Sequence, residues 1–219
     1  MRAFNDIYQI ALKRHGEPAL AARLQSPKPA DELAALPPDR WLSLMTRCIF
    51  QAGFNWRVID AKWDGFEEAF HGFDIGRCAM MDDAWLDTLL RDTRIVRNGP
   101  KIQTVRDNAV FIQSLNAQGG AGTVLGGWPS TDFVGLLDLL KSEGSRLGGM
   151  SGQYAMRFAG RDAFILSRDV TARLMAEGVI DKPAGSKSSM RAIQDAFNIW
   201  MDQSGRGLTQ ISQILAMSV

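Results

Sequence analysis

Asp169 is a carboxylate at the expected start of a helix, a position from which it could stabilise a positive charge. It follows a short apolar run, residues 163–166, and precedes a segment with helical spacing that begins near Val170. An aspartate at the start of a helix is kept ionised by the helix dipole and by free backbone N–H groups. An ionised carboxylate can stabilise a cationic transition state and accept a proton from water. A plain N-cap role fits the same position, and one residue can play both roles.

A glycine-rich turn upstream of Asp169 has the features of an anion site. Residues 143–153 read EGSRLGGMSGQ, and we expect a helix to resume at Ser151 or Gly152. Glycines let the backbone approach a ligand closely, and the free N–H groups at the start of a helix bind phosphate. Taken alone, the turn also fits a plain helical hairpin. The residues that we expect to contact a phosphate are Gly149, Met150, Ser151, Gly152 and Gln153.

The elements that must position these residues are almost all helices. Apolar side chains recur with a spacing of three or four residues along most of the chain. Residues 119–127 form the least regular stretch, which we expect to be a loop and a junction between two lobes. The sequence therefore predicts an all-α fold of about ten helices. The expected helices cover residues 2–14, a segment opening at Pro37, one capped by Asn55, one starting at Asp82 or Asp83, one after Gly99-Pro100, and residues 133–141, 188–202 and 208–217.

Composition narrows the class of protein without naming a function. The chain has 219 residues, 46% hydrophobic and 22% charged, with a net charge of +1, which is ordinary for a globular protein. No stretch is apolar enough to span a membrane and the N-terminus does not read as a signal peptide, so we expect a cytoplasmic protein. The two cysteines and two histidines lack metal-ligand spacing, so we expect no disulfide and no metal site.

The hairpin and Asp169 together resemble the helix-hairpin-helix motif of the base-excision DNA glycosylases, the superfamily of endonuclease III and the adenine glycosylases. Leu147, Gly149 and Met150 match its Leu-Pro-Gly-Val-Gly turn, while Gly148 and Ser151 depart from it. The resemblance implies a two-lobed fold with a cleft between the lobes and Asp169 as the catalytic carboxylate. It implies one lobe from residues 20–130 and a second, carrying the hairpin, from residues 1–19 and 131–219.

A second resemblance is to the 3-methyladenine DNA glycosylase I family. Phe50–Trp56 is similar to that family's Gln-Gln-Ala-Gly-x-x-Trp, and Ile95–Ile102 to its Ile-Ile-Arg-x-x-x-Lys-Ile. The family's pocket glutamate, eight residues before the tryptophan, is replaced here by Cys48, and its terminal zinc ligands have no counterparts. Conversely, the family lacks a catalytic aspartate in its usual place, whereas this chain has Asp169.

These resemblances together cover about residues 40–175 and suggest a role for each motif. An aromatic pocket favours an N-alkylated purine because the adduct is cationic and is attracted to the faces of the rings. Gln153 stands where bifunctional glycosylases carry a nucleophilic lysine, and an amide is not a nucleophile. The implied residues are Trp56, Tyr8, Phe4 and Cys48 in the base pocket, Gln51 or Phe54 as the wedge that fills the gap in the DNA, Lys101 on a phosphate, and Arg97, Arg157 and Arg173 as further members of a basic face.

The sequence therefore predicts a monofunctional DNA glycosylase that removes an alkylated purine such as 3-methyladenine from double-stranded DNA. We expect it to act as a monomer, without a membrane and without a cofactor, apart from a monovalent cation that the hairpin could hold. Three alternatives stay open at this point. They are a non-catalytic helix-hairpin-helix DNA-binding protein, a helical interaction protein without affinity for DNA, and a glycosylase for a different damaged or mismatched base.

Overall fold

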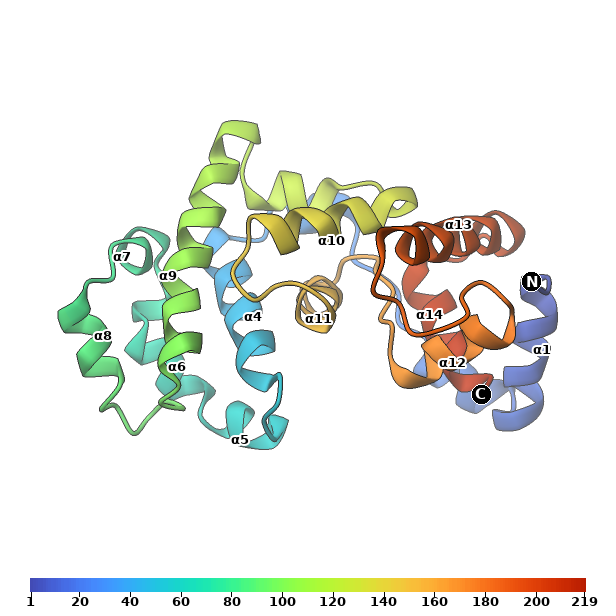
Figure 1. Ribbon diagram of the computed structural model, residues 1–219, viewed down its shortest axis with the longest axis horizontal. Coiled ribbons are helices and arrows are strands. Elements are labelled where there is room, and N and C mark those ends of the chain that lie inside the picture. Colours follow the sequence, from blue (N-terminus) through green and yellow to red (C-terminus); the bar gives the residue numbers. More distant parts are fainter. The chain divides into compact units, whose positions relative to one another are not determined.

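The computed structural model describes residues 1–219, and helices form its whole regular framework, with no β-strand (Figure 1). The predicted all-α class is therefore confirmed. No helix has the length and apolar character that crossing a bilayer requires. The α-helices are α1 (Phe4–His15), α2 (Glu17–Arg23), α3 (Ala30–Ala34), α4 (Pro38–Gln51), α5 (Trp56–Ala61), α6 (Trp63–Ala69), α7 (Ile75–Ala79), α8 (Asp83–Leu89), α9 (Gly99–Ser114), α10 (Phe133–Ser142), α11 (Met150–Ala159), α12 (Arg168–Ala176), α13 (Lys187–Ser204) and α14 (Leu208–Met217).

Side-chain caps set several of the helix starts. The Asn55 carboxamide oxygen accepts a hydrogen bond from the Arg57 N–H at 3.0 Å and begins α5, as the sequence predicted. Asp82 caps α8 in the same way, accepting from the N–H of Trp85 at 2.8 Å. These contacts satisfy N–H groups that the first turn of a helix leaves without an intrahelical acceptor.

The contacts within the chain divide it into two compact units. The terminal unit consists of residues 1–28, 129–136 and 160–219, and the central unit of residues 29–128 and 137–159. This division differs from the lobes that we expected, because residues 137–159, which carry the hairpin, group with the central unit and not with the chain ends. Their partners explain the difference, since α11 packs against α4.

The central unit is built around α4, which lies between α9 and α11 (Figure 1). Trp41, Met45 and Phe50 of this helix are fully buried. The glycine-rich stretch 119–127 that we expected to be an irregular loop follows the 3-10 turn η2 (Leu115–Gln118) and itself contains the π-helical turn η3 (Gly122–Gly126), which packs against α3.

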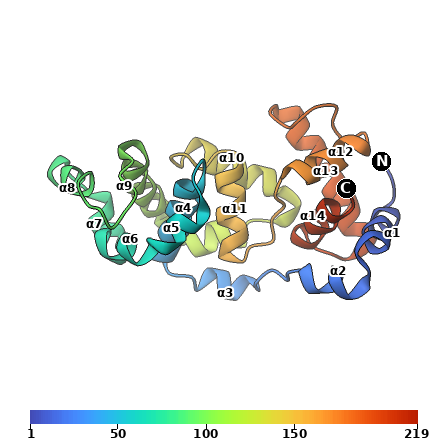
Figure 2. The same ribbon diagram turned by 90° about the horizontal axis from the view of Figure 1, so that it is seen from below.

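The terminal unit packs α14 against α1, α12 and α13, and α1 and α14 lie side by side in both views (Figures 1 and 2). The apolar run before α12 is extended and has no strand to pair with. Hydroxyl groups of α14 take the place of a strand, since Thr209 Oγ1 accepts from the N–H of Ala163 at 3.1 Å and Ser212 Oγ accepts from the N–H of Ile165 at 3.0 Å. Two polar residues of α14 are thereby buried without an unpaired group.

Arg173 is part of this unit's interior and not of a basic surface. Its guanidinium donates to Glu177 Oε1 at 3.2 Å and to the Ser218 hydroxyl at 2.7 Å, and the side chain is buried. The prediction that it contributes to a DNA-binding face is therefore wrong.

Candidate functional site

Trp56 is an exposed aromatic residue at the first position of α5 in the central unit. Its side chain is 40% exposed. Its ring contacts Tyr154 edge-to-face at a centroid distance of 5.1 Å and Phe158 at 6.0 Å. The structure therefore does not support core packing as the reason for Trp56, because a tryptophan that served only the core would be enclosed.

The turn that leads to Trp56 is held by a buried lysine. The Lys101 ammonium donates to the carbonyl oxygens of Phe50 at 3.2 Å and Ala52 at 2.6 Å, and it lies 4.9 Å from the ring centroid of Phe54. A cation at the C-terminal end of α4 also interacts favourably with the helix dipole. Burial, together with the charge of Arg146, lowers the pKa of this ammonium. Because two of its three N–H groups donate to backbone carbonyls, Lys101 positions the turn, and the expectation that it binds a phosphate is not supported.

The two side chains proposed as a wedge have different surroundings. Gln51 is buried and its amide donates to Asp60 Oδ1 at 3.0 Å, an oxygen that also accepts from Arg47 at 2.7 Å. Phe54 is 42% exposed at the tip of the same turn. Of the two candidates, Phe54 is therefore the exposed one, whereas Gln51 supports the turn.

The hairpin begins with a glycine turn whose geometry needs two of its glycines. Gly149 has φ +64°, a conformation that costs other residues strain. At Gly152 a Cβ atom would lie 2.3 Å from the carbonyl oxygen of Leu147, so the turn closes only without a side chain there. The structure thus explains why Gly152 is present although the usual second glycine of the motif is Ser151.

Helix α11 starts one residue earlier than expected, at Met150. The backbone N–H of Gln153 donates to the carbonyl of Gly149 at 3.5 Å, and the Gln153 side chain is buried. The backbone N–H of Gln153 is therefore used within the helix and is not free for a phosphate. The N–H groups of Met150, Ser151 and Gly152 are the ones that helix geometry leaves without an intrahelical acceptor.

Asn108 of α9 fixes the loop that enters the hairpin. Its carboxamide donates to the Ser145 carbonyl at 3.1 Å and accepts from the Ser145 N–H at 2.8 Å. This pairing to the N–H and the carbonyl of one residue anchors the loop through the backbone. It gives a physical reason for the asparagine that follows the Ile95–Ile102 motif.

Cys48 lies in α4 behind the turn and is almost fully enclosed, with 4% exposure. Burial raises the pKa of its thiol to about 12, and the nearby Arg47 guanidinium only partly opposes this shift. The position at which the resembling family has a glutamate therefore carries no charge at neutral pH.

Tyr8 and Phe4, which were expected in the base pocket with Trp56, belong to a different unit. Both lie on α1 of the terminal unit, whereas Trp56 lies in the central unit. Phe4 is a core residue and Tyr8 lies against the Arg206 guanidinium at 5.3 Å. The rings that the structure brings to Trp56 are instead Tyr154 and Phe158, which the sequence analysis missed. Their spacing of four residues on one helix face was the signal that could have found them.

Asp169 lies in the first turn of α12 and is exposed. The N-cap is Ser167, whose hydroxyl accepts from the N–H of Val170 at 3.3 Å, so the capping role that we considered for Asp169 is wrong. The carboxylate keeps the favourable field of the helix N-terminus.

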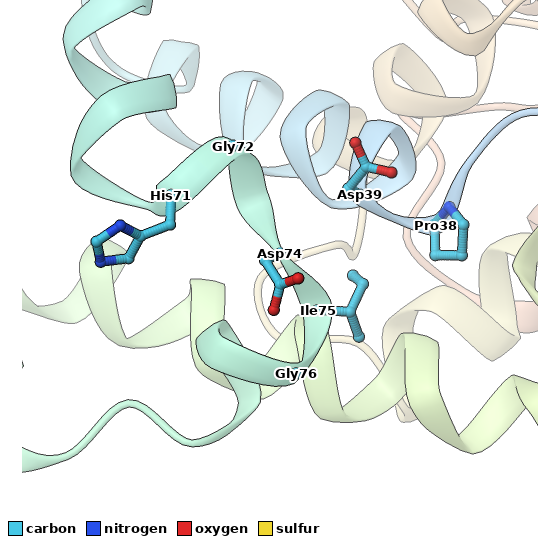
Figure 3. A pocket seen from close by; sticks show the side chains of 7 residues that line it. All are labelled: Pro38, Asp39, His71, Gly72, Asp74, Ile75 and Gly76. Carbon is cyan, nitrogen blue, oxygen red and sulfur yellow. The ribbon is translucent and has the colours of Figure 1, made fainter.

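A pocket of about 360 Å³ lies elsewhere in the central unit, where Pro38 and Asp39 at the start of α4 face residues 71–76 (Figure 3). None of the predicted site residues lines it. Trp56 follows the opposite end of α4, which is about 20 Å away along a helix of that length. This pocket is therefore separate from the site formed by the rings of Trp56, Tyr154 and Phe158.

The chain offers no set of ligands for a metal. No group of three or more histidine, cysteine, aspartate or glutamate side chains lies close enough to hold an ion. Cys48 and Cys78 are both free and buried. The residues present thus do not fit the terminal zinc site of the resembling family.

Comparison with known proteins places Trp56 inside a recognisable segment. Residues 39–124 match the methyladenine glycosylase family. DNA-3-methyladenine glycosylase 1 of Escherichia coli (strain K12) is 30% identical over 84 residues, which is 38% of this chain. The matched segment spans 41% of that relative's length. Residues 39–124 include both motifs on which the resemblance was based, so the predicted resemblance to the 3-methyladenine DNA glycosylase I family is confirmed.

Solved structures extend the likeness to the fold. A crystal structure of 3-methyladenine DNA glycosylase I (TAG) superposes with a TM-score of 0.50 and 21% identity, covering 65% of this chain and 86% of that one. A variant of that enzyme in complex with 3-methyladenine gives the same TM-score and identity, covering 68% and 88%. The chain thus has the all-α fold of these glycosylases.

Proposed function

We propose that this protein is a monofunctional DNA glycosylase that hydrolyses the N-glycosidic bond of an alkylated purine, such as 3-methyladenine, in double-stranded DNA. The observation that carries the proposal is that Trp56, within the segment that matches methyladenine glycosylases, is an exposed ring and not a core residue. We further infer that the protein acts as a monomer in the cytoplasm and needs no cofactor, although the hairpin could hold a monovalent cation.

The base must leave the stack before it can react. Phe54, exposed at the tip of the turn, is the wedge that would fill the vacated space. The extruded purine would then stack on Trp56. An alkylated purine in DNA carries a positive charge, which an aromatic face attracts more strongly than it attracts the neutral base.

The start of α11 would hold a phosphate of the DNA backbone. The N–H groups of Met150, Ser151 and Gly152 point out of the first turn of a helix, and the dipole of the helix favours an anion there. Such contacts fix the register of a protein on the duplex without reading its sequence.

Asp169 would supply the chemistry. Its carboxylate would stabilise the positive charge that develops on the sugar as the base departs, and would orient or deprotonate the attacking water. An alkylated purine is already a good leaving group, so the site needs no strong general acid. Gln153 cannot attack the sugar, and no strand-nicking step follows.

The proposal is tested by a release assay. Purified protein is incubated with methylated duplex DNA, and the released bases are identified by mass. We expect 3-methyladenine to be released and the strands to stay intact until the abasic sites are cleaved by alkali. Release of no base from any alkylated duplex would contradict the proposal.

A second candidate, a glycosylase for a different damaged base, is favoured by one observation. The neutral thiol of Cys48 replaces the glutamate of the resembling family, while the chain has an aspartate at the general superfamily position. The same assay on duplexes with oxidised or mismatched bases separates the two candidates by which base appears.

A further inference from the structure

The rings of Trp56, Tyr154 and Phe158 form one exposed cluster, here named the aromatic surface. Their centroids are 5.1, 5.5 and 6.0 Å apart, so each ring touches the other two. Trp56 is 40% exposed, Phe158 is 44% exposed and Tyr154 is half-buried. We propose that Tyr154 and Phe158 act with Trp56 as the stacking surface for the extruded base, an inference that rests on the proposed function and names the substrate-contacting residues of its site.

The helical phase of α11 shows that these two rings are not needed to fill the core. Ala155, Met156 and Ala159 are the buried residues of this part of the helix. Tyr154 and Phe158, four residues apart, lie on another face, and Met150 continues that face by one more turn and is also exposed. A contiguous exposed apolar face of this kind marks a binding surface more often than it marks packing.

The charges around the rings favour nucleic acid as the occupant. The segments that supply the rings, residues 51–58 and 150–159, contain two arginines, Arg57 and Arg157, and no acidic residue. The nearest carboxylate along α5, that of Asp60, is already bound to Arg47 and Gln51. Aromatic side chains beside cationic ones suit a polyanion whose bases stack, because every base presents a π-face.

The same arrangement defines how the site would select its base. With a neutral thiol at Cys48, no carboxylate of the resembling family's kind is available to a cationic purine. Discrimination between the alkylated and the ordinary base must then come from the rings, through stacking and cation–π attraction. Loss of either α11 ring should therefore weaken the binding of an alkylated purine.

The experiment measures binding of free 3-methyladenine by equilibrium dialysis, with bound and free base quantified by mass; the free base is neutral near pH 7, so the assay measures the stacking contribution of the rings. Wild type is compared with Tyr154→Ala, Phe158→Ala and Phe158→Leu, and with Tyr154→Phe, which keeps the ring. Ile199→Ala is the matched control, because Ile199 is as exposed as Phe158 but lies on α13 in the terminal unit. Melting temperatures are recorded for every variant.

We expect Tyr154→Ala, Phe158→Ala and Phe158→Leu each to weaken binding at least about fivefold, the lower end of what one stacked base contributes. Tyr154→Phe and Ile199→Ala should bind like wild type. If an alanine variant melts early, Phe158→Leu decides the question, since it removes the ring and keeps most of the apolar volume, and Tyr154→Phe serves as the control that retains the ring.

The release assay, run in parallel, separates this inference from the proposed function. If wild type releases 3-methyladenine and the ring variants bind and release it equally well, the aromatic surface has no part in base recognition and the inference is wrong. If wild type releases nothing, the proposed function fails, and absence of binding in dialysis overturns the inference with it. If base binding is unchanged but the ring variants alter the sedimentation of the protein, the surface is a protein interface and the inference is equally wrong.

Discussion

Asp169 carries its charge in the first turn of α12, while the capping hydrogen bond belongs to Ser167. The two roles considered for Asp169, capping the helix and supplying a negative charge, are thus divided between Ser167 and Asp169. A substitution that removes only the charge of Asp169 leaves the cap in place. The residue can therefore be tested for chemistry with little risk to the fold.

Asp169→Asn should reduce base release on the order of 100- to 1000-fold, the typical effect of losing one preorganised electrostatic group. The effect should be smaller for a cationic lesion, whose departure is intrinsically easier. The measurement is single-turnover release from methylated DNA, with Asp181→Asn as a matched exposed control in the same unit. Wild-type rates on every lesion would show that Asp169 has no catalytic role.

Cys48 and Cys78 should resist alkylation in the folded protein. Burial raises the pKa of both thiols to about 12, so at pH 8 the reactive thiolate is about one part in ten thousand. Mass spectrometry after iodoacetamide treatment should find neither residue modified until denaturant is added. Rapid labelling of Cys48 in the native state would mean that the region behind the turn opens to solvent.

At the scale of elements, Lys101 of α9 holds the end of α4 and the start of the turn that leads to α5. Its ammonium donates to the carbonyl of Phe50 in the last turn of α4 and to that of Ala52 just after the helix. This arrangement couples a helix distant in sequence to the loop that presents Phe54 and Trp56. The turn owes its shape to a partner about fifty residues away along the chain.

Lys101→Met should destabilise the protein by about 1–3 kcal/mol, because it leaves buried carbonyl oxygens without a donor. Base release should fall as well, since the wedge and the aromatic ring lose their support. Urea unfolding measures the first effect and the release assay the second. Lys13→Met, on the exposed side of α1, serves as the control. Unchanged stability in Lys101→Met would mean that water replaces the ammonium at no cost.

Local sequence signals predicted the helices well where the cap is a side chain. Asn55 and Asp82 were identifiable because their oxygens reach N–H groups two or three residues ahead. Ser167 was overlooked because Asp169, two residues later, is also a good cap. Residues 119–127 were expected to be irregular from their glycines, whereas residues 122–126 form a π-helical turn that packs against α3.

The site was predicted only as far as its contacts are local. Trp56 and the hairpin turn could be recognised from motifs. The burial of Gln51, the internal role of Lys101 and the proximity of Tyr154 and Phe158 to Trp56 depend on how α4, α5, α9 and α11 pack. No spacing within a single segment carries that information.

For the molecule as a whole, the two ends of the chain belong to the same unit, in which residues 1–28 pack with residues 160–219. Ile7 of α1 and Ile211 of α14 are both fully buried in it, and α1 packs on α14. The prediction of one lobe from residues 20–130 and a second from residues 1–19 and 131–219 could not foresee that residues 137–159 leave the unit of the chain ends, because only the packing of α11 on α4 decides it.

Fragments 1–128 and 129–219 should not fold when they are made separately. The first would lack α11 against α4, and the second would lack α1 against α14, so each would expose apolar surface that the whole chain buries. Circular dichroism melts of each fragment should show no cooperative transition, and mixing the two should restore one. A cooperative melt of the isolated second fragment would show that α1 is dispensable.

The hydroxyl groups of Thr209 and Ser212 accept hydrogen bonds from the backbone N–H groups of the extended segment before α12. In the exchange of amide hydrogens with heavy water, the protons of Ala163 and Ile165 should behave like those of a helix although they belong to none. The segment just before Asp169 would then be among the slow-exchanging parts of the chain. Such protection means that the polypeptide delivering the carboxylate is rigid before any DNA arrives, and none of the binding energy would be spent on ordering it.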